Sequence, residues 1–459
     1  MKRRTIRSHA IAAMLLAGFV SGCPSEPSTT VPTEEPTTKA TPTQSTSAMT
    51  KPKPPTVSPV QAGGPAREAV KASNHFGFDL YQKLREQDGS FAYSPASISL
   101  ALSMTFAGAK SDTAKEMAKV MHLPEDKTKF HGGWATVLAA WSRPPKVDPH
   151  AEDDGTPAYE LAVANRLFGE KTYKFEQPFL KLTKDRYGAP LEMVDFAGAF
   201  EKQLLYINSW VEEQTRKRIK DLIPKDGIDD QTRLVLTNAL YFKAKWLEPF
   251  REQRTKDGTF TTEKGESIKV PMMHHSRHAR YGETDDVQIL ELPYAGERFA
   301  MVFALPKKGK KLGDVEAKLS GELFQSWLKA ATGAQVNITL PRFKIDPPKS
   351  VQLSKTLIEM GMKLAFQRTN ADFTGIGNPP SPEDRLYISK VFHKAFVAVD
   401  EKGTEAAAAT AVVMTRGGGM APKPVDFTVD RPFLFFIRDK EAGLIMFVGR
   451  VHDPRAKTS

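Results

Sequence analysis

The fold of this 459-residue chain is decided by one stretch near its C-terminus, Gly403-Thr404-Glu405-Ala406-Ala407-Ala408-Ala409-Thr410-Ala411-Val412-Val413. The stretch carries one charge and very little side-chain bulk. Alanine has the highest helix propensity, but so short a helix is marginally stable alone in water. In a strand, alternate residues share a face, and here one face holds only small or β-branched side chains while Glu405 lies on the other. We therefore expect a segment that can enter a β-sheet; the alternative is a flexible, alanine-rich surface loop.

The residues around this stretch extend the pattern into a family resemblance. Asp400-Glu401-Lys402-Gly403-Thr404-Glu405, followed by four alanines and Thr410, resembles the hinge of an inhibitory serpin. Other blocks that resemble the family follow one another in the same order: residues 91–100, 207–211, 219–224, 237–246, 291–294, 340–343, 371–376 and 431–435. Each block is a weak signal alone, but together they identify the chain as a member of the serpin family over about residues 66–455. Ala244 stands where glycine is usual, which concerns local packing only.

The resemblance implies a fold and a mechanism. The fold is α+β, with three β-sheets, about eight or nine helices and an exposed reactive-centre loop at about residues 401–425. In the mechanism, a serine protease attacks the loop and forms an acyl-enzyme intermediate, and the freed loop then inserts as a strand into the sheet called A. A charged or bulky residue facing inward would raise the barrier to that insertion. The implied partner is a target serine protease, held as a covalent acyl complex, and the chain itself is not an enzyme.

Hydrophobic periodicity agrees with a mixed α and β chain. Apolar residues at helical spacing predict a helix from Glu68 to Leu84 and another through residues 204–211, and capping-box spacing from Thr113 to Glu116 predicts the start of a third. Runs of β-branched and aromatic residues predict strands at 233–243, 299–305, 335–345, 386–399, 432–438 and 444–451. The last two are separated by a short turn through Gly443, which predicts a hairpin.

Two structural sites follow from the resemblance. The first is the shutter, beneath the point where sheet A must part, to which four residues are carried over: Ser94, Ser97, Asn238 and His393. A histidine, an asparagine and two hydroxyls can satisfy one another in a small buried network. The second is a salt bridge between Arg342 and Glu401, which the resemblance places at the top of the sheet, where it would steady the hinge.

The reactive bond is expected within the loop tip, residues 414–420. Counting from Glu401 as in most serpins places Gly417 just before the scissile bond, whereas a count one residue shorter places Arg416 there. Arg416 is the only basic residue of the tip, and a trypsin-like pocket with a buried carboxylate selects such a residue. We favour cleavage between Arg416 and Gly417 by a trypsin-like protease. The alternatives are Gly417 with an elastase- or subtilisin-like protease, and a bond beside Met414 or Met420.

Residues 1–22 predict a bacterial lipoprotein signal. Four basic residues within the first seven precede an apolar stretch from Ile11 to Val20, and Val20-Ser21-Gly22-Cys23 follows. In lipoprotein signals a peptidase cuts before the cysteine, which then carries the lipid, so the expected lipid site is Cys23, the only cysteine of the chain. The alternative is an ordinary secretory signal cut elsewhere. The implied location is the cell envelope or the extracellular space, with a lipid anchor in a bacterial membrane.

Composition then divides the rest of the chain. Residues 23–65 are dominated by Pro, Thr, Ser, Lys and Glu and contain no aromatic residue, which predicts a disordered tether. Residues 66–459 have ordinary globular composition with no internal repeat or linker, so we expect one serpin domain there.

Charge and the remaining motifs exclude several function classes. The formal net charge of +11 falls to +7 without the four basic residues before Cys23, which is moderate and gives no reason to expect nucleic acid as a partner. The region where some serpins carry a polyanion-binding helix contains Pro144, Pro145 and the acidic residues 152–154, so no polyanion cofactor is expected. No nucleophile elbow, phosphate-binding glycine loop or metal motif occurs. The nearest approach to a metal site is a histidine cluster that fits a loop or strand edge better, His274, His275 and His278. We expect no metal, no cofactor and a monomer.

Two other function classes stay open. One is a non-inhibitory serpin-like binding or carrier protein, and the other is a structural surface lipoprotein. Non-inhibitory serpins often carry charge or bulk at the inward hinge positions, where this chain has small residues. The hinge therefore favours an inhibitor.

Overall fold

The structure is a computed structural model, and it describes residues 66–143, 157–404 and 423–455, all within one compact unit, Lys51–Ser459. The α-helices in these ranges are α1 (Ala66–Leu84), α2 (Pro95–Ala107), α3 (Ser111–Val120), α4 (Lys127–Trp141), α5 (Gln177–Tyr187), α6 (Phe196–Gln214), α7 (Leu312–Lys318), α8 (Gly321–Ala330) and α9 (Ser354–Glu359). Short 3-10 helices are η1 (Glu252–Arg254), η2 (Leu364–Phe366) and η3 (Pro382–Asp384). None of the helices in the described ranges is both long and apolar enough to cross a membrane.

The strands in the same ranges form three sheets of nine, six and two strands. They are β1 (Phe91–Tyr93), β2 (Tyr159–Glu170), β3 (Leu191–Val194), β4 (Leu234–Lys245), β5 (Lys256–Thr261), β6 (Ser267–Glu283), β7 (Val287–Pro293), β8 (Phe299–Pro306), β9 (Thr332–Pro341), β10 (Phe343–Ile345), β11 (Val351–Gln352), β12 (Phe392–His393), β13 (Val397–Val399), β14 (Gly403–Thr404), β15 (Val425–Thr428), β16 (Phe433–Asp439) and β17 (Leu444–Val451). The described ranges therefore contain three sheets and nine α-helices, which is the expected α+β fold.

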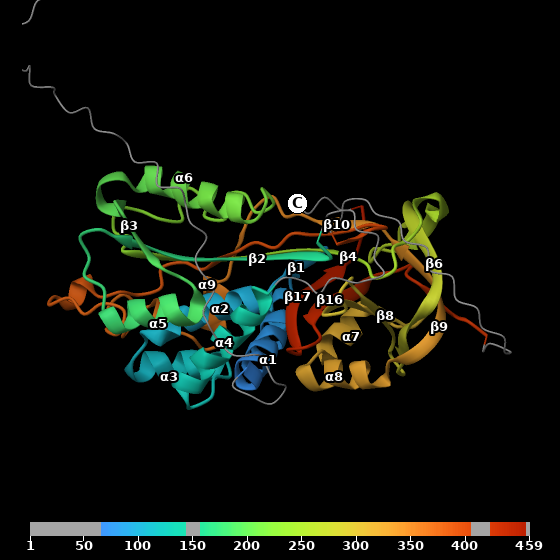
Figure 1. Cartoon of the computed structure of the whole chain (residues 1–459), viewed down its shortest axis with the longest axis horizontal. Coiled ribbons are helices and arrows are strands. Elements are labelled where there is room, and N and C mark those ends of the chain that lie inside the picture. Colours follow the sequence, from blue (N-terminus) through green and yellow to red (C-terminus); the bar gives the residue numbers. More distant parts are fainter. Residues whose placement is uncertain (1–65, 144–156, 405–422, 456–459) are drawn as a thin grey trace, which may run out of the picture. The chain divides into compact units, whose positions relative to one another are not determined.

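The six-stranded sheet runs in the order β10-β13-β14-β4-β2-β3 and lies between two helical layers (Figure 1). Its centre is the long antiparallel pair of β2 and β4, in register from Tyr159 opposite Ala244 to Gly169 opposite Leu234. Helix α6 covers one face, where Phe168 of the sheet packs edge-on against Trp210. Helix α2 and its neighbours cover the other face.

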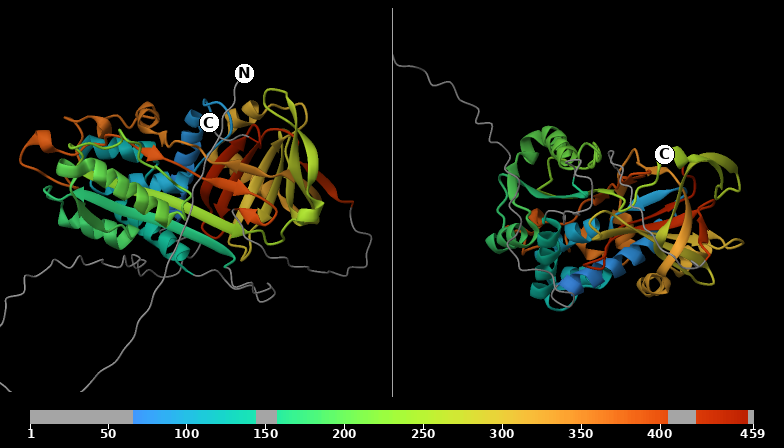
Figure 2. Two further views of the ribbon diagram at one scale, coloured as in Figure 1. Left: turned by 90° about the horizontal axis from the view of Figure 1, so that it is seen from above. Right: turned by 45° about the vertical axis from the view of Figure 1, so that its right-hand side comes forward.

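The nine-stranded sheet runs in the order β1-β17-β16-β8-β7-β6-β9-β15, with β5 added beside β6. All residues of β8 and β17 are buried, so these strands lack the alternation of a half-exposed strand. The β16–β17 hairpin confirms the predicted one, and its turn has Gly443 at a φ of 72°, a left-handed conformation that favours glycine. Figure 2 shows this sheet, in yellow to red, beside the green strands of the six-stranded sheet.

The structure confirms the helix predicted from Glu68 to Leu84, as α1, but corrects three other boundaries. Helix α3 starts at Ser111, and Thr113 is not its cap: the hydroxyl of Thr113 accepts from the backbone of Asp372 instead. The strand predicted for 335–345 is two strands, because the chain leaves the nine-stranded sheet at Pro341 and enters the six-stranded one at Phe343. The strand predicted for 386–399 is present only as β12 and β13, because residues 386–391 have no partner strand in the described ranges.

Candidate functional site in the six-stranded sheet

The start of the predicted hinge already lies inside the six-stranded sheet. Thr404 of β14 pairs with Val399 of β13 on one side and with Ala244 of β4 on the other. The Thr404 side chain is 2% exposed, and a 2.5 Å hydrogen bond joins its hydroxyl to that of Tyr294. The resemblance implied an exposed loop from about residue 401, so the burial of these first residues is a correction. The rest of the predicted hinge, residues 405–410, lies outside the described residues, as do Arg416, Gly417 and Cys23.

Glycine is required at position 403 for a steric reason. Gly403 has a φ of 152°, and a Cβ atom there would overlap the carbonyl oxygen of Ala244. The backbone of β14 can therefore approach β4 closely only with glycine at this position. Any larger residue would push the hinge away from the sheet.

The turn before β14 is fixed by side chains that sequence reasoning did not find. The Asp400 carboxylate accepts from the backbone N–H groups of Lys402 and Gly403, at 2.9 and 3.2 Å. Trp246 donates its backbone N–H to the Lys402 carbonyl and its indole N–H to the Asp400 carbonyl. The Trp246 ring stacks on Tyr294 with centroids 4.6 Å apart. The spacing of Asp400 and Gly403 is a turn signal that could have been read from the sequence.

Glu401 and Arg342 form an ion pair at the root of the hinge. The Arg342 guanidinium donates to one Glu401 carboxylate oxygen from Nε at 2.8 Å and from Nη2 at 2.6 Å. Thr255 donates its hydroxyl to the same oxygen. Burial alone would raise the pKa of Glu401, but the hydrogen bonds from Arg342 and Thr255 bring it below its ordinary value. Because the Glu401 side chain is only 4% exposed, loss of Arg342 would leave a buried carboxylate without its charged partner. Breaking a buried pair costs about 3 to 5 kcal/mol, and the cost is lower here because Arg342 is 44% exposed.

Below the hinge, one edge of β4 has no partner strand in the part of the chain that the structure describes. Within the described ranges, no strand pairs with that edge from Leu234 to Lys243, although β2 pairs along the whole of the opposite edge. A cavity of about 220 Å³ lies there, lined by residues 234–238 of β4 on one side and residues 385–393 on the other. Further along the same edge, Thr404 lies between Ala244 of β4 and Val399 of β13, in the position of an intervening strand.

The four shutter residues meet beside this cavity, around Asn238 of β4. Ser94 caps helix α2, accepting from the backbone N–H of Ser97, and donates its own backbone N–H to His393 Nε2 at 3.0 Å. The Ser94 hydroxyl donates to the Met446 carbonyl at 2.6 Å, and the Ser97 hydroxyl donates to Asn238 Oδ1. The bond at Nε2 needs a neutral His393 ring. The network thus joins helix α2 to β4 and β12 and leaves His393 no function as a proton donor at that nitrogen.

The network continues to residues that the resemblance did not supply. Asn238 donates its side-chain amide to Asn165 Oδ1, and Asn165 donates its own to the Tyr187 carbonyl at 3.1 Å. The Tyr187 hydroxyl lies 2.5 Å from His131 Nδ1 on helix α4. All three added residues are buried, and they connect the shutter to helices α4 and α5. Nothing in the sequence places residues 131, 165 and 187 near one another.

We expect the stability of the protein to fall between about pH 6.5 and pH 4. Burial lowers the pKa of His393 to about 4. Burial, together with the charges of Lys127 and Arg186, also lowers the pKa of His131 to about 4. An unfolded histidine titrates near 6.5, so in that window the unfolded chain binds more protons, and each histidine can remove at most about 3 kcal/mol of stability. Urea unfolding of wild type, His393→Gln and His131→Gln at pH 7.0, 5.5 and 4.5 tests this. Each variant should lose less stability on acidification than wild type; equal losses would contradict the assignment.

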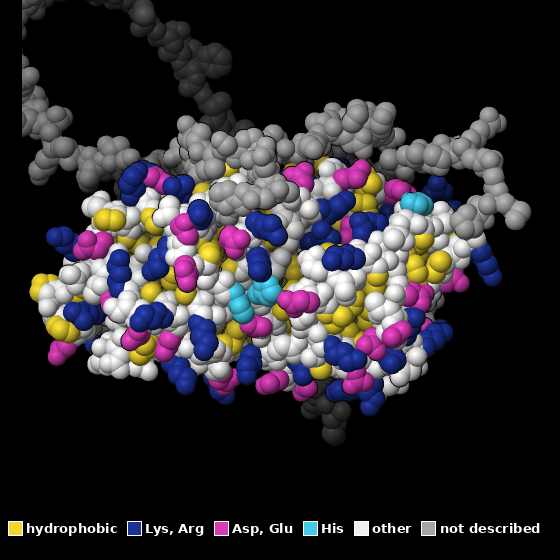
Figure 3. Space-filling model, turned by 90° about the horizontal axis from the view of Figure 1, so that it is seen from below, with side chains coloured by type: hydrophobic (Ala, Val, Ile, Leu, Met, Phe, Trp, Pro, Cys, Tyr) yellow, Lys and Arg dark blue, Asp and Glu magenta, His cyan; other side chains and the backbone are white. Residues whose placement is uncertain are grey.

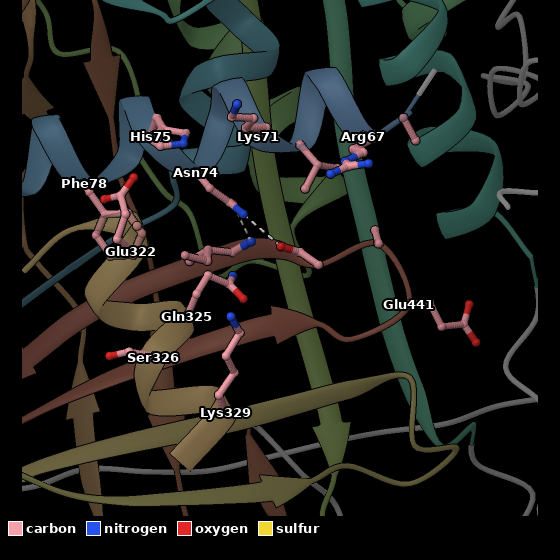
Figure 4. A pocket seen from close by; sticks show the side chains of 16 residues that line it. Arg67, Lys71, Asn74, His75, Phe78, Glu322, Gln325, Ser326, Lys329 and Glu441 are labelled. Atoms are coloured by element: carbon pink, nitrogen blue, oxygen red, sulfur yellow. Dashed lines mark hydrogen bonds between the residues drawn. The ribbon is translucent and has the colours of Figure 1, made fainter. Parts of the chain in front are cut away.

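Two other features were considered as sites, a histidine cluster and a cavity. The cluster His274, His275 and His278 sits on strand β6, where alternate residues face opposite sides, and no group of metal-ligating side chains in the described part of the chain can hold an ion. A cavity of about 780 Å³ lies between α1, α8 and the β16–β17 turn (Figure 4). At its base Asn74 donates to the Gly443 carbonyl and accepts from the Ile445 N–H, which ties α1 to the turn. Neither feature shares a residue with the hinge or the shutter.

In the described part of the chain, the six-stranded sheet holds Gly403 and Thr404 at the upper end of an otherwise unpaired edge of β4. A family model described as serpin (serine protease inhibitor) matches residues 71–454. The chain belongs to the serpin family of serine protease inhibitors and is not an enzyme.

Individual relatives agree with this assignment. A serpin-like protein of Thermococcus kodakarensis is 39% identical over 99% of each chain, and the human leukocyte elastase inhibitor is 37% identical over 83% of this chain and 98% of its own. Among solved structures, Serpin48 of the insect Tenebrio molitor, described as a highly specific serpin, has a TM-score of 0.71 and 32% identity, covering 84% of this chain and 98% of its own.

Proposed function

We propose that this protein is an inhibitory serpin that traps serine proteases by inserting its cleaved loop beside β4. The observation that carries the proposal is the edge of β4 from Leu234 to Lys243, which has no partner strand among the described residues, with Thr404 already paired at its upper end. The small inward hinge residues support inhibition over a carrier function, because they can follow Thr404 into the sheet without bringing a charge inside.

The energy for trapping comes from the strand that forms. Each new backbone hydrogen bond contributes on the order of 1 kcal/mol net, so a dozen or so supply roughly 10 kcal/mol, and apolar burial adds more. A folded protease is stable by only about 5 to 15 kcal/mol. Insertion can therefore distort a protease that is still attached to the loop, provided that insertion is faster than deacylation.

The direct test uses the full-length protein in a non-ionic detergent. It is mixed with a trypsin-like protease, an elastase and a subtilisin, and each mixture is run on a denaturing gel, with the cleavage position read by mass spectrometry. We expect a covalent complex with at least one protease. Free cleavage of the loop by all three proteases, with no complex, would remove the basis for a trap.

We further propose that the target is trypsin-like and cuts between Arg416 and Gly417. Arg416 is the only basic residue of residues 414–420, and replacing it by alanine should lower the rate of complex formation with a trypsin-like protease by about 100-fold or more, since the charge contact in the specificity pocket is lost. Gly417→Ala is the matched control and should keep most of the rate. If Arg416→Ala keeps the wild-type rate, the bond lies elsewhere.

An elastase-like target is the second candidate, because the leukocyte elastase inhibitors are relatives at 37 to 38% identity.

We propose a lipid anchor at Cys23, which would place the inhibitor on a bacterial membrane at the end of a tether of residues 23–65. The support is the basic start, the apolar stretch and the single cysteine after Val20-Ser21-Gly22. Cys23→Ala should move the protein from the membrane pellet to the soluble fraction and abolish labelling by a radioactive fatty acid. Unchanged fractionation and labelling would favour an ordinary secretory signal. This test is independent of protease inhibition.

A further inference from the structure

The cavity between α1, α8 and the β16–β17 turn lies where the described part of the chain begins. Its lining runs along α1 from Ala66 to Phe78, a length of about 18 Å at about 1.5 Å per helical residue. Its base is apolar, with Val70 and Phe78 of α1 and Ile445 of β17. Its volume of about 780 Å³ lies within the roughly 300 to 1,000 Å³ that ligand pockets have. We call this cavity the α1–α8 pocket.

Two polar side chains of α8 reach into the α1–α8 pocket. Gln325 and Lys329 line the pocket and point toward its middle in Figure 4. Within the described ranges, neither side chain forms a hydrogen bond or an ion pair. Other polar groups of the lining are in use: Ser326 donates to the Leu323 carbonyl at 2.7 Å, and Asn74 holds the β16–β17 turn. The pocket therefore offers N–H donors above an apolar base, which suits a chain segment whose carbonyl groups are free.

The sequence just before α1 has the composition that this pocket would accept. Val57 and Val60 are two of the three valines in residues 23–65, and they belong to the run Pro54-Pro55-Thr56-Val57-Ser58-Pro59-Val60. A polyproline II helix has three residues per turn and no internal hydrogen bonds, so in that conformation the two valines share one face and the carbonyl groups stay free. Residues typical of a turn, Gly63-Gly64-Pro65, follow directly before Ala66.

The length of chain between Val57 and Ala66 matches the length of the pocket. A turn at residues 63–65 would send the preceding residues back along α1, which is the direction in which the pocket extends. At about 3.1 Å per residue, Val60 then lies about 10 Å and Val57 about 20 Å from the turn. The apolar base of the pocket ends at Phe78, about 18 Å along α1 from Ala66. Both valines can therefore reach the base.

Charge does not favour a separate partner in this pocket. Helices α1 and α8 lie along the lower side of the molecule in Figure 1, and on the face seen from below in Figure 3 basic, acidic and hydrophobic side chains are interspersed. The lining of the pocket likewise carries both signs, with Arg67 and Lys71 opposed by Glu322 and Glu441. Apolar contact and proximity then decide, and a segment joined to Ala66 by a short linker is present at an effective concentration of about millimolar.

We propose that residues 57–60 of the chain's own tether dock in the α1–α8 pocket. Val57 and Val60 lie against the apolar base, and Gln325 and Lys329 donate to carbonyl groups of the segment. Docking leaves residues 23–56 as the free tether and turns the face formed by α1 and α8 toward the point of attachment. The inference depends neither on the inhibitory function nor on a lipid at Cys23.

Hydrogen exchange measured by mass spectrometry tests this proposal on the full-length protein in a non-ionic detergent. The exchange rate of each backbone amide is divided by the rate of an unstructured peptide of the same sequence. V57D/V60D puts two charges on the docking segment, and V31D/A40D is the matched control, with the same two charges further from the domain.

A second pair of variants changes the pocket and leaves the tether intact. Gln325→Trp fills the pocket from an exposed position of α8, so the fold should tolerate it. Glu201→Trp is its control and places the same side chain at an exposed position of α6, away from the pocket. Melting temperatures within a few degrees of wild type establish that both variants are folded.

We expect residues 56–62 of wild type to exchange about tenfold more slowly than residues 28–48. V57D/V60D and Gln325→Trp should both remove this difference, whereas the two control variants should keep it. Equal exchange of the two segments in wild type would overturn the docking, whether the pocket is empty or holds a small molecule. Slow exchange that V57D/V60D loses but Gln325→Trp keeps would place the segment elsewhere and overturn the pocket assignment. Slow exchange that disappears on dilution would mean that the pocket takes the tether of a second copy, which contradicts docking of the chain's own tether.

Discussion

Thr404→Arg is expected to convert the protein from an inhibitor into a substrate. Thr404 is 2% exposed and lies between Val399 and Ala244, with its hydroxyl bonded to Tyr294. An arginine at this position would have to bury a charge with no partner, which costs several kcal/mol, or hold the hinge outside the sheet. In either case insertion slows, the acyl-enzyme hydrolyses first, and active protease is released. The covalent complex on a denaturing gel should fall at least tenfold while cleavage of the loop continues.

Thr404→Val is the matched control for this prediction. Valine keeps the shape and the β-branch of threonine but removes the hydrogen bond to Tyr294, worth about 1 kcal/mol. We expect Thr404→Val to keep forming the complex, with a changed rate only. Full inhibition by Thr404→Arg would show that the strand position above β4 is not the route of insertion.

Sequence patterns predicted the elements whose signal is local. Helix α1 follows from apolar spacing, and the β16–β17 hairpin follows from two apolar runs around Gly443. Family motifs supplied the four shutter residues and the pair of Arg342 and Glu401, and the structure brings these residues together. Further contacts extend the shutter through Asn165 and Tyr187 to His131. These contacts join segments that are far apart in the chain, so no local spacing in the sequence predicts them.

The sequence-based predictions that were wrong share a physical cause. Whether a segment forms a strand or a cap depends on which residues from other parts of the chain lie opposite it. Residues 386–391 are apolar enough for a strand, yet a strand needs a partner, and there the edge of β4 is separated from them by a cavity. Gly403 and Thr404 look like the start of a loop, yet they find partners on both sides. The Thr113 capping pattern is real in sequence, but the hydroxyl is used by Asp372 from another part of the chain. Tertiary contacts decide each case.

Cleavage of the loop is expected to raise the melting temperature of the protein. The edge of β4 from Leu234 to Lys243 is unpaired among the described residues, and a strand that continues from Thr404 along it would pair there and against residues 385–393. At about 1 kcal/mol for each backbone hydrogen bond, plus the apolar area buried, the inserted form should gain roughly 10 to 20 kcal/mol. For a domain of this size that corresponds to an increase of about 10 to 25 °C in melting temperature.

The measurement is calorimetry on intact and loop-cleaved protein, and Thr404→Arg separates insertion from cleavage itself. Both proteins are cut within residues 411–420 by a protease that leaves by hydrolysis, and mass spectrometry verifies a single cut. Wild type should show the full increase, whereas Thr404→Arg should show little or none, because an arginine beside Tyr294 blocks the first step of the new strand. Cut wild type that melts at the temperature of the intact protein would mean that the open edge of β4 is not filled after cleavage, and the energy assigned to the trap would have no source. An equal increase in both proteins would locate the gain in stability outside the strand position above β4.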